Sequence, residues 1–387
     1  MRRYTNQLLS ALILLLALTG CIHPVYTTSS HTVFISSDNG TLQALNAKTG
    51  KAKWQCKLGK VQVNAAPIVS DGLVIMTTSE EAAILAFDAT TGSLKWKKAL
   101  PDGLIFSARI TDKTIYALAT NKAFWDYSDK NFTTLYALDM STGNLKWSFQ
   151  TGSQPTWAAL SNTDENCPLV CKGTVYFGGS DGLFYAINAE KGTIKWTYSA
   201  GVSFYSSPVC VDNVVYIGDA NGSLLALDDS TGKLKWRVHD SYTIHAGIAT
   251  DNKHLFVPYD GPASVAAYSL TDGSKRWLFT PSTFISSAPS VANGLLYLSS
   301  EDGMFYAIDT SSGLPKWKTR LLASQITVPT VVNNTIYVGG GRNMYALDAS
   351  TGKQKWAFFA GGNVVKSACI QTQNGIVFRG LGAIQPQ

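Results

Sequence analysis

Hydrophobic and polar residues alternate along this chain in short runs that are separated by turn residues. Residues 207–211, 214–218, 223–228 and 233–238 show the pattern clearly, and Asn221-Gly222 marks one of the turns. Alternation with a period of two residues is typical of strands that bury one face. Because the pattern returns about every 40 residues, the sequence predicts a series of repeats with four short strands in each.

A motif of Ala, Asp or Asn (Ser269 in the sixth copy), Gly, a cation and Trp closes every repeat, and its first copy runs from Ala44 to Trp54. The Gly supplies the positive φ that a tight turn needs, and the Asp or Asn bonds the turn's own amides. Since the Ala never varies, we expect the large Trp ring to pack against it. The eight motif tryptophans, for which we expect a structural docking role, are Trp54, Trp96, Trp147, Trp196, Trp236, Trp277, Trp317 and Trp356.

Four strands in a repeat of about 40 residues describe the blade of a β-propeller. Eight copies therefore predict an all-β, eight-bladed β-propeller of four-stranded antiparallel blades over residues 33–380, with a short tail at 381–387. The first repeat lacks an innermost strand, whereas residues 366–372 resemble one. We expect residues 366–372 to complete the blade of residues 33–57. The run around Ile376 is then one strand more than the scheme needs.

The N-terminal residues 1–20 have the features of a signal peptide. Arg2 and Arg3 precede the apolar run Leu8–Leu18, which is too short for a stable membrane span. The run ends in Leu18-Thr19-Gly20-Cys21, which resembles a bacterial lipobox. We therefore expect a lipoprotein signal peptide, an acylated Cys21, and a lipidated N-terminus and tether over residues 21–32. The alternative is an ordinary signal peptide followed by an incidental cysteine.

Net charge, cysteine content and the absence of catalytic motifs narrow the range of possible functions. The net charge of +6 falls to +4 without Arg2 and Arg3, which is too mild and too dispersed for a nucleic-acid-binding protein. Five cysteines follow Cys21, and Cys167 and Cys171 lie in or beside a loop where a disulfide could close in an exported protein. We found no catalytic spacing of Ser, His and Asp, no zinc motif and no phosphate-binding loop. The sequence thus indicates no catalytic, cofactor-binding or metal-ligating residue.

Two insertions interrupt the regular spacing, at residues 123–132 and 154–166. Each follows an even-numbered strand of a meander, so we expect both on the same face of the propeller. They carry the four aromatic residues that we predict to form a partner-binding patch: Phe124, Trp125, Tyr127 and Trp157. Exposed aromatic residues on a rigid scaffold favour protein binding. The alternative is that these side chains cover the end of their own blade.

The motif resembles the tryptophan-docking motif of PQQ-type propellers, whose consensus is Ala-x-Asp-x-x-Thr-Gly-x-x-x-Trp. Two branches of that superfamily matter. Quinoprotein dehydrogenases hold pyrroloquinoline quinone and calcium, but this chain lacks their adjacent Cys-Cys pair. The BamB family of outer-membrane β-barrel assembly factors is similar in its lipobox, its length and its lean blades.

The resemblance to the BamB family implies a non-enzymatic, lipid-anchored and monomeric scaffold without a cofactor. Its partner would be another envelope protein, such as a β-barrel assembly factor. It would sit at the outer membrane, facing the periplasm, if the source has two membranes, and otherwise on the outer face of the plasma membrane. In a two-membrane source, Ile22, where a lipoprotein retained in the inner membrane usually has Asp, favours the outer membrane. The alternative function is a quinoprotein-type enzyme or a sensor that binds a small ligand.

Overall fold

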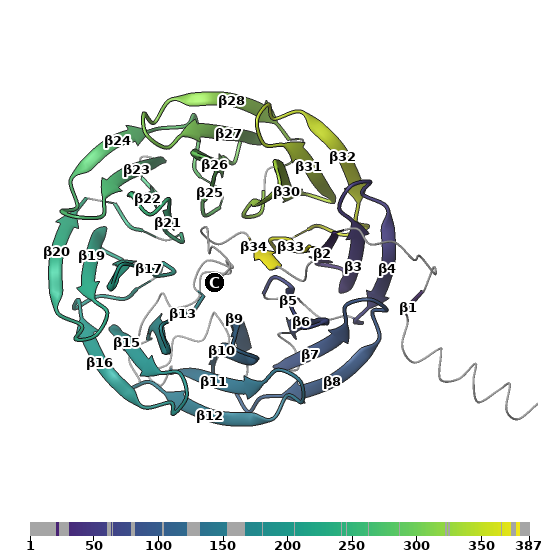
Figure 1. Ribbon diagram of the computed structural model, residues 1–387, viewed down its shortest axis with the longest axis horizontal. Coiled ribbons are helices and arrows are strands. Elements are labelled where there is room, and N and C mark those ends of the chain that lie inside the picture. Colours follow the sequence, from purple (N-terminus) through teal and green to yellow (C-terminus); the bar gives the residue numbers. More distant parts are fainter. Residues whose placement is uncertain are drawn as a thin grey trace, which may run out of the picture.

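The alternating runs form eight antiparallel β-sheets, which are arranged as blades around a common axis (Figure 1). The computed structural model describes residues 21–22, 31–59, 63, 65–78, 82–102, 104–121, 132–152, 167–179, 181–204, 206–240, 242–244, 246–261, 263–285, 287–321, 323, 326–364, 366–372 and 377–379. The predicted eight-bladed propeller is thereby confirmed. Among the described residues there is no helix whose length and apolarity would suit a membrane crossing.

Seven blades contain four strands each, with the first strand of the repeat innermost and the fourth at the rim. Blade 2 comprises β5 (Ile68–Ser70), β6 (Leu73–Thr78), β7 (Ala83–Asp88) and β8 (Leu94–Ala99). Blade 3 comprises β9 (Leu104–Thr111), β10 (Thr114–Thr120), β11 (Thr133–Asp139) and β12 (Leu145–Gln150). Blade 4 comprises β13 (Leu169–Cys171), β14 (Thr174–Gly178), β15 (Leu183–Asn188) and β16 (Ile194–Ser199).

Blades 5 to 8 continue the same order around the ring. Blade 5 comprises β17 (Val209–Val211), β18 (Val214–Gly218), β19 (Ser223–Asp228) and β20 (Leu234–His239), and blade 6 comprises β21 (Ala249–Thr250), β22 (His254–Tyr259), β23 (Ser264–Ser269) and β24 (Lys275–Phe279). Blade 7 comprises β25 (Ser290–Ala292), β26 (Leu295–Ser299), β27 (Met304–Asp309) and β28 (Pro315–Arg320). Blade 8 comprises β29 (Thr330–Val332), β30 (Thr335–Gly340), β31 (Asn343–Asp348) and β32 (Gln354–Phe359). The four strands of blade 5 agree closely with the ranges that the sequence predicts.

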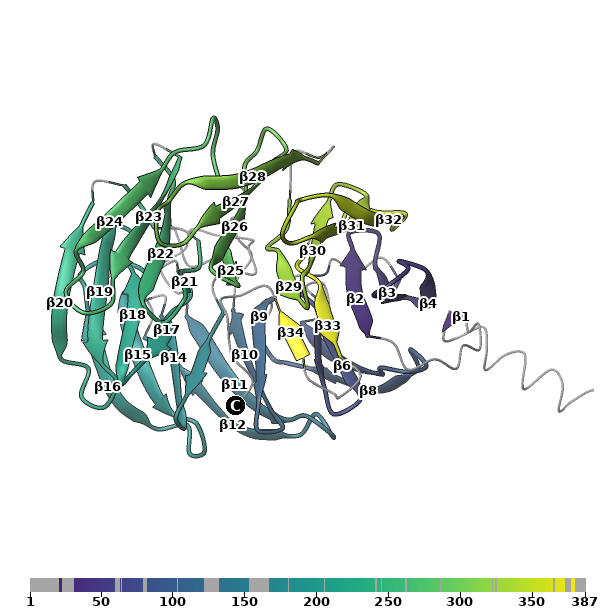
Figure 2. The same cartoon turned by 45° about the horizontal axis from the view of Figure 1, so that its top comes forward.

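Blade 1 is built from both ends of the chain. Its strands β2 (Thr32–Ser37), β3 (Thr41–Asn46) and β4 (Ala52–Lys57) are completed by β33 (Cys369–Gln371), which pairs with β2 as predicted. Two further strands extend this sheet. β34 (Val377–Arg379) pairs with β33 on the axial side, and β1 (Cys21–Ile22) pairs with β4 at the rim (Figure 2). The surplus C-terminal run therefore becomes an additional inner strand of the closing blade.

Each motif tryptophan connects its own blade to the next one. The indole N–H of Trp54 donates to the carbonyl of Ala89 in blade 2 at 3.0 Å, and that of Trp356 donates to Ala47 in blade 1 at 2.9 Å, which closes the ring. The other six tryptophans repeat the bond at 2.9–3.2 Å. Trp54 and Trp196 are buried, whereas the remaining six are half-buried. Trp236 is thus less deeply placed than a core residue.

The motif glycine has a second role, which the sequence pattern did not reveal. Gly92 has a φ of +72°, and a Cβ atom at this position would lie 2.7 Å from the Trp54 ring of the preceding blade. The same close approach occurs at all eight motif glycines. The expected contact of Ala with Trp is present as a strand pairing, for example Ala44 opposite Trp54. Each indole is therefore held between its own blade and the glycine turn of the next blade.

The turn carboxylates behave as the sequence predicts. The Asp139 carboxylate accepts hydrogen bonds from the hydroxyls and main-chain N–H groups of Ser141 and Thr142 at 2.6–3.0 Å. These bonds hold the pKa of Asp139 below its usual value. In the sixth repeat Ser269 replaces the Asp, and its hydroxyl accepts only a longer bond of 3.3 Å from the Thr271 N–H. The turn that receives the tryptophan is thus rigid before docking.

We expect Trp54→Ala to lower the free energy of unfolding by about 3–5 kcal/mol, because it removes a buried large side chain. Gly92→Ala should also destabilise, since the added methyl meets the ring and the backbone has positive φ. Denaturant unfolding of both single variants and the double variant measures their coupling. The Gly92→Ala cost should shrink in the Trp54→Ala background. An unchanged cost would show that the glycine serves the turn conformation alone.

Candidate functional site

One face of the propeller carries both the connections between blades and the connections between second and third strands. We call it the connection face. Isolated bridges such as Phe204 with Asp219 and Ile285 with Ser300 join a connection between blades to the end of a second strand, which places both on this face. The two insertions interrupt connections of these same two types. The strands that flank both insertions end or begin on this face, while residues 122–131 and 153–166 lie outside the described residues, so the shared face of the insertions stays a prediction.

The ends of the two insertions are hydrogen-bonded to one another. Thr133, just after the first insertion, donates its N–H to the Thr151 hydroxyl at 3.0 Å, and the Thr151 N–H donates to the Thr133 carbonyl at 2.9 Å. The Gly152 N–H then donates to the Asp181 carboxylate at 3.0 Å. The predicted patch residues Phe124, Trp125, Tyr127 and Trp157 lie outside the described residues. Their common location therefore remains a prediction, although their flanking residues lie together.

Buried tyrosines fix several connections on this face. The Tyr136 hydroxyl donates to Asp102 at 2.6 Å, and Tyr185 donates to Asp181. Burial, followed by the neighbouring carboxylate, raises the pKa of both tyrosine hydroxyls. They therefore stay protonated and act as donors at neutral pH. Asp181 thus receives bonds from both Tyr185 and Gly152, so it attaches the start of the second insertion to blade 4.

A larger polar cluster fixes the connection between blades 5 and 6. Tyr268 donates to Asp240, the hydroxyls of Tyr259 and Tyr268 lie 2.9 Å apart, and the Lys275 ammonium lies 2.8 Å from Asp240. Burial alone raises the pKa of Asp240, but the hydrogen bonds from Lys275 and Tyr268 outweigh it and leave that pKa below its usual value. Asp240 is therefore ionised at neutral pH, and the cluster is a rigid support.

Two exposed aromatic residues on this face escaped the sequence analysis. Tyr242 is 46% exposed and Phe284 is 54% exposed, and they lie on successive connections between blades. Their neighbours Ile244 and Ile285 are anchored, since Ile244 is fully buried and Ile285 bridges to Ser300. The sequence offered little signal for them, because Tyr242 and Phe284 lie in no insertion and are offset by one position relative to the motif tryptophans of their repeats. They add a second aromatic surface over blades 5 to 7.

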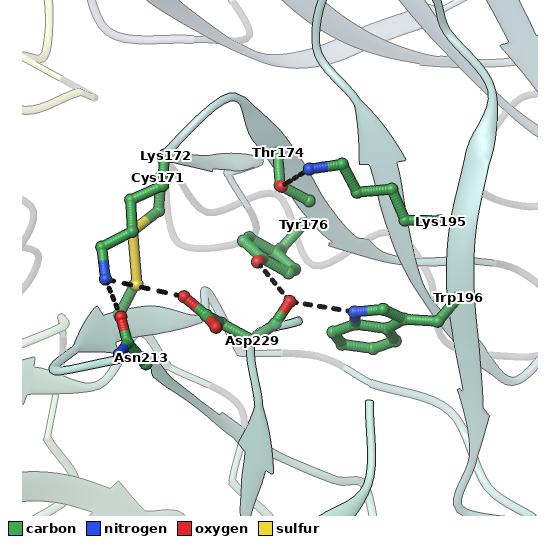
Figure 3. The surroundings of a disulfide bond; sticks show 9 residues. Cys171, Lys172, Thr174, Tyr176, Lys195, Trp196, Asn213 and Asp229 are labelled. Carbon is green, nitrogen blue, oxygen red and sulfur yellow. Dashed lines mark hydrogen bonds and ion pairs between the residues drawn. A yellow bond between two sulfur atoms is a disulfide. The ribbon is translucent and has the colours of Figure 1, made fainter. Parts of the chain in front are cut away.

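The predicted disulfide between Cys167 and Cys171 is wrong. Cys171 is bonded to Cys210, which joins the innermost strands β13 and β17 of two neighbouring blades (Figure 3). Their Cα atoms are 6.6 Å apart, within the usual range of about 4.4–6.8 Å. Cys167 is buried, and its N–H donates to the Ser207 hydroxyl at 2.8 Å. Adjacent strands of different blades, rather than sequence neighbours, bring the two sulfurs together.

The disulfide belongs to a wider contact between blades 4 and 5. The Asp229 carbonyl accepts from both the Tyr176 hydroxyl and the Trp196 indole N–H at 3.0 Å, and the Lys172 ammonium lies 3.7 Å from the Asp229 carboxylate (Figure 3). Lys172 also donates to the Asn213 side chain. The covalent link at the inner strands thus complements the tryptophan contact near the rim.

The axial end of blade 1 bears on whether a quinone fits this propeller. β34 lies next to β29 of blade 8 and β5 of blade 2, on the inner side of the closing blade (Figures 1 and 2). A flat cofactor that bound beside the inner strand of blade 1 would meet β34 there.

Comparison with known proteins gives the family. The family described as outer membrane protein assembly factor BamB matches residues 18–103, 38–182, 163–243 and 239–358, which together span most of the chain. The chain belongs to this family. Among curated proteins it is 25% identical to BamB of Yersinia pestis over 81% of this chain and 57% of that protein. It is also 27% identical to the serine/threonine-protein kinase AfsK of Streptomyces griseus, over 59% of this chain and 24% of the kinase.

Solved structures share the fold. BamB from Moraxella catarrhalis superposes with a TM-score of 0.63 at 17% identity, covering 89% of this chain and 99% of that one. A quinohemoprotein alcohol dehydrogenase from Comamonas testosteroni superposes with a TM-score of 0.59 at 15% identity, covering 84% and 75%. At these identities the likeness concerns the fold alone. The chain also spans little more than half of the Yersinia BamB and a quarter of the kinase, so their activities do not transfer directly.

We expect Cys210→Ser to lower the free energy of unfolding by about 2–4 kcal/mol under oxidising conditions, because the bond closes a loop with a sequence separation of 39 residues. Under reducing conditions, in which the wild type also lacks the bond, the variant and the wild type should have similar free energies of unfolding. Non-reducing peptide mapping should recover one linked peptide pair containing Cys171 and Cys210. Cys167→Ser serves as the control, and a linked pair that contains Cys167 would contradict the assignment.

Proposed function

We propose that this protein is a lipid-anchored, non-enzymatic scaffold that binds another envelope protein through its connection face during outer-membrane protein assembly. Membership of the BamB family is the observation that carries this proposal. The hydrogen-bonded ends of the two insertions on blades 3 and 4 support a single binding surface there. Residues 1–20 are the signal peptide in this proposal, Cys21 carries the acyl chains, and the partner is a β-barrel assembly factor.

The architecture suits such a scaffold. Indole–carbonyl bonds, the disulfide and the Tyr–Asp pairs fix the blades and several of their connections before any partner arrives. A rigid surface loses little conformational entropy on binding, so its aromatic side chains contribute more of their contact energy to affinity. Tyr and Trp are also the residues enriched at the energetic centres of interfaces.

A quinoprotein-type enzyme or small-ligand sensor is the alternative function, and the fold it shares with the quinohemoprotein alcohol dehydrogenase favours it. Titration of the purified protein with pyrroloquinoline quinone and calcium distinguishes the two functions. A saturable, calcium-dependent absorbance change would replace the scaffold proposal with the enzyme or sensor. A linear change with added quinone would leave the scaffold in place.

We expect Cys21→Ser to release the protein from the membrane fraction, because one sulfur carries the lipid that holds the chain there. The measurement is fractionation of cells after a high-salt wash, with mass spectrometry of the mature N-terminus. Wild type should show an acylated N-terminal cysteine. A Cys21→Ser variant that stays in the membrane fraction after the wash would contradict the lipobox interpretation.

We expect the double variant Trp125→Ala, Trp157→Ala to reduce partner capture in a crosslinking pull-down by at least about tenfold, since central aromatic residues each contribute about 2 kcal/mol or more. Its melting temperature should match wild type, because both residues belong to insertions. The matched control is Tyr242→Ala with Phe284→Ala on blades 5 to 7. Loss of capture in the control alone would move the binding surface to that side of the connection face.

A further inference from the structure

The N-terminal strand fixes where the mature chain begins on the propeller. β1 pairs antiparallel with β4, with Cys21 opposite Cys56 and Ile22 opposite Gln55. β4 is the outermost strand of blade 1, so residue 21 lies at the outer edge of the ring (Figure 1). An acyl chain on Cys21 would therefore begin at the rim of blade 1, on neither flat face of the disc.

The same rim carries an uncompensated positive charge. Residues 39–70 contain five lysines and no Asp or Glu, and the matching stretch of every other repeat has at least one carboxylate. Lys48, Lys51 and Lys57 are exposed at the two ends of β4: Lys48 and Lys51 lie in the turn before it, and Lys57 follows the residue that pairs with Cys21. This stretch lies between Asp38 and Asp71, and the net charge of the whole chain is only +6, so the stretch carries much of the excess.

The turn residue of the motif contributes one charge to this excess, because it is Asn in blade 1, as it also is in blade 4 (Asn188). In blades 2, 5, 7 and 8 the rim lysine pairs with the turn Asp, for example Lys95 with Asp88 at 3.2 Å. Blade 1 has Asn46 at that position, and Lys53 donates instead to the Thr32 hydroxyl at 2.6 Å. Among the ion pairs of the described residues, none involves Lys48, Lys51 or Lys57. Their charges therefore face solvent.

The neighbouring blades extend this surface with suitable side chains. Lys98 is exposed on β8 of blade 2. On blade 8, Phe359 is 63% exposed at the position that corresponds to Lys57. The same position holds polar residues in most repeats, such as Gln150, His239 and Arg320. Lysines beside an exposed aromatic ring are typical of surfaces that lie in the headgroup region of a bilayer.

We propose that the rim of blade 1, formed by Lys48, Lys51 and Lys57 with Lys98 and Phe359 beside it, binds the anionic phospholipid headgroups of the membrane in which Cys21 is anchored. We call it the lysine rim. The proposal rests on the proposed function in one respect, because the lipid anchor at Cys21 is what brings this rim to the membrane. The positive charge of the rim does not depend on the anchor. The disc then stands with its rim toward the bilayer. Its connection face points along the membrane plane, open to a partner.

Vesicle sedimentation tests the lysine rim without the lipid. The Cys21→Ser chain is mixed with vesicles of phosphatidylcholine alone or with added phosphatidylglycerol, at low and at high salt. We expect binding to the anionic vesicles that weakens with salt, since screening reduces such attraction. The triple variant Lys48→Glu, Lys51→Glu, Lys57→Glu should lose at least about tenfold of this binding, because a basic residue near an anionic surface contributes about fivefold.

A second triple variant separates the rim from overall charge. Lys191→Glu, Lys233→Glu and Lys318→Glu change exposed lysines on blades 4, 5 and 7 and alter the net charge equally. The proposal expects this control to keep most of the binding. Equal loss in both triple variants, or equal binding to neutral and anionic vesicles, would overturn it. Circular dichroism melting of both variants checks that each is folded.

Lysine labelling places the acylated protein on a membrane. Wild type is reconstituted into phosphatidylglycerol-containing vesicles and treated with an amine-reactive reagent, and the same reaction is run in detergent. We expect vesicles to protect Lys48, Lys51 and Lys57 and to leave Lys191, Lys233 and Lys318 reactive. Unprotected rim lysines in a firmly anchored protein would refute the lysine rim and leave the lipid anchor intact. A protein that lacks acylation but binds anionic vesicles would refute the lipid anchor and leave the lysine rim intact.

Discussion

The structure depends on one contact, repeated eight times, in which an indole ring enters the glycine turn of the next blade. The ring sits where a side chain on that glycine would clash, and its N–H donates to the carbonyl of the residue after the turn Asp or Asn, or after Ser269 in the sixth repeat. At five interfaces a tyrosine hydroxyl bonds the same carbonyl, as Tyr176 does beside Trp196. Shape and hydrogen bonding together fix the angle between neighbouring blades.

The ring is closed by contacts between the two ends of the described chain. β33 supplies the inner strand of blade 1, and the last indole, Trp356, donates to Ala47 of that blade. The sheet then continues inward with β34 and outward with β1. Both edges of this one sheet are covered by the chain's own termini, which limits pairing with foreign strands. Blade 1 is therefore both the closing blade and the blade on which residue 21 lies.

The two flat faces of the disc have different constraints. Turns between third and fourth strands must receive an indole, so their sequence is held to Gly and Asp or Asn with little room for change. Connections on the opposite face have no such contact, and there the described part of the chain has its exposed Tyr242 and Phe284 and its Tyr–Asp supports. Variation is concentrated on the connection face because the docking contact leaves it free.

The sequence by itself determined what depends on near neighbours. Strand bounds, the Asp139 type of turn, the number of blades and the pairing of residues 369–371 with blade 1 all follow from period, turn chemistry and repeat count. The position of the insertions on the connection face also follows, because it needs only the order of strands in a meander. The side chains of that predicted patch lie outside the described residues.

Only the tertiary structure decided what depends on two blades meeting. It paired Cys171 with Cys210 across adjacent inner strands and gave each motif glycine an indole from the preceding blade. It also left Trp236 half-buried and Phe359 exposed on the blade next to blade 1. A repeat pattern specifies one blade at a time, whereas these contacts depend on the angle and spacing between blades. That geometry exists only once the ring has closed.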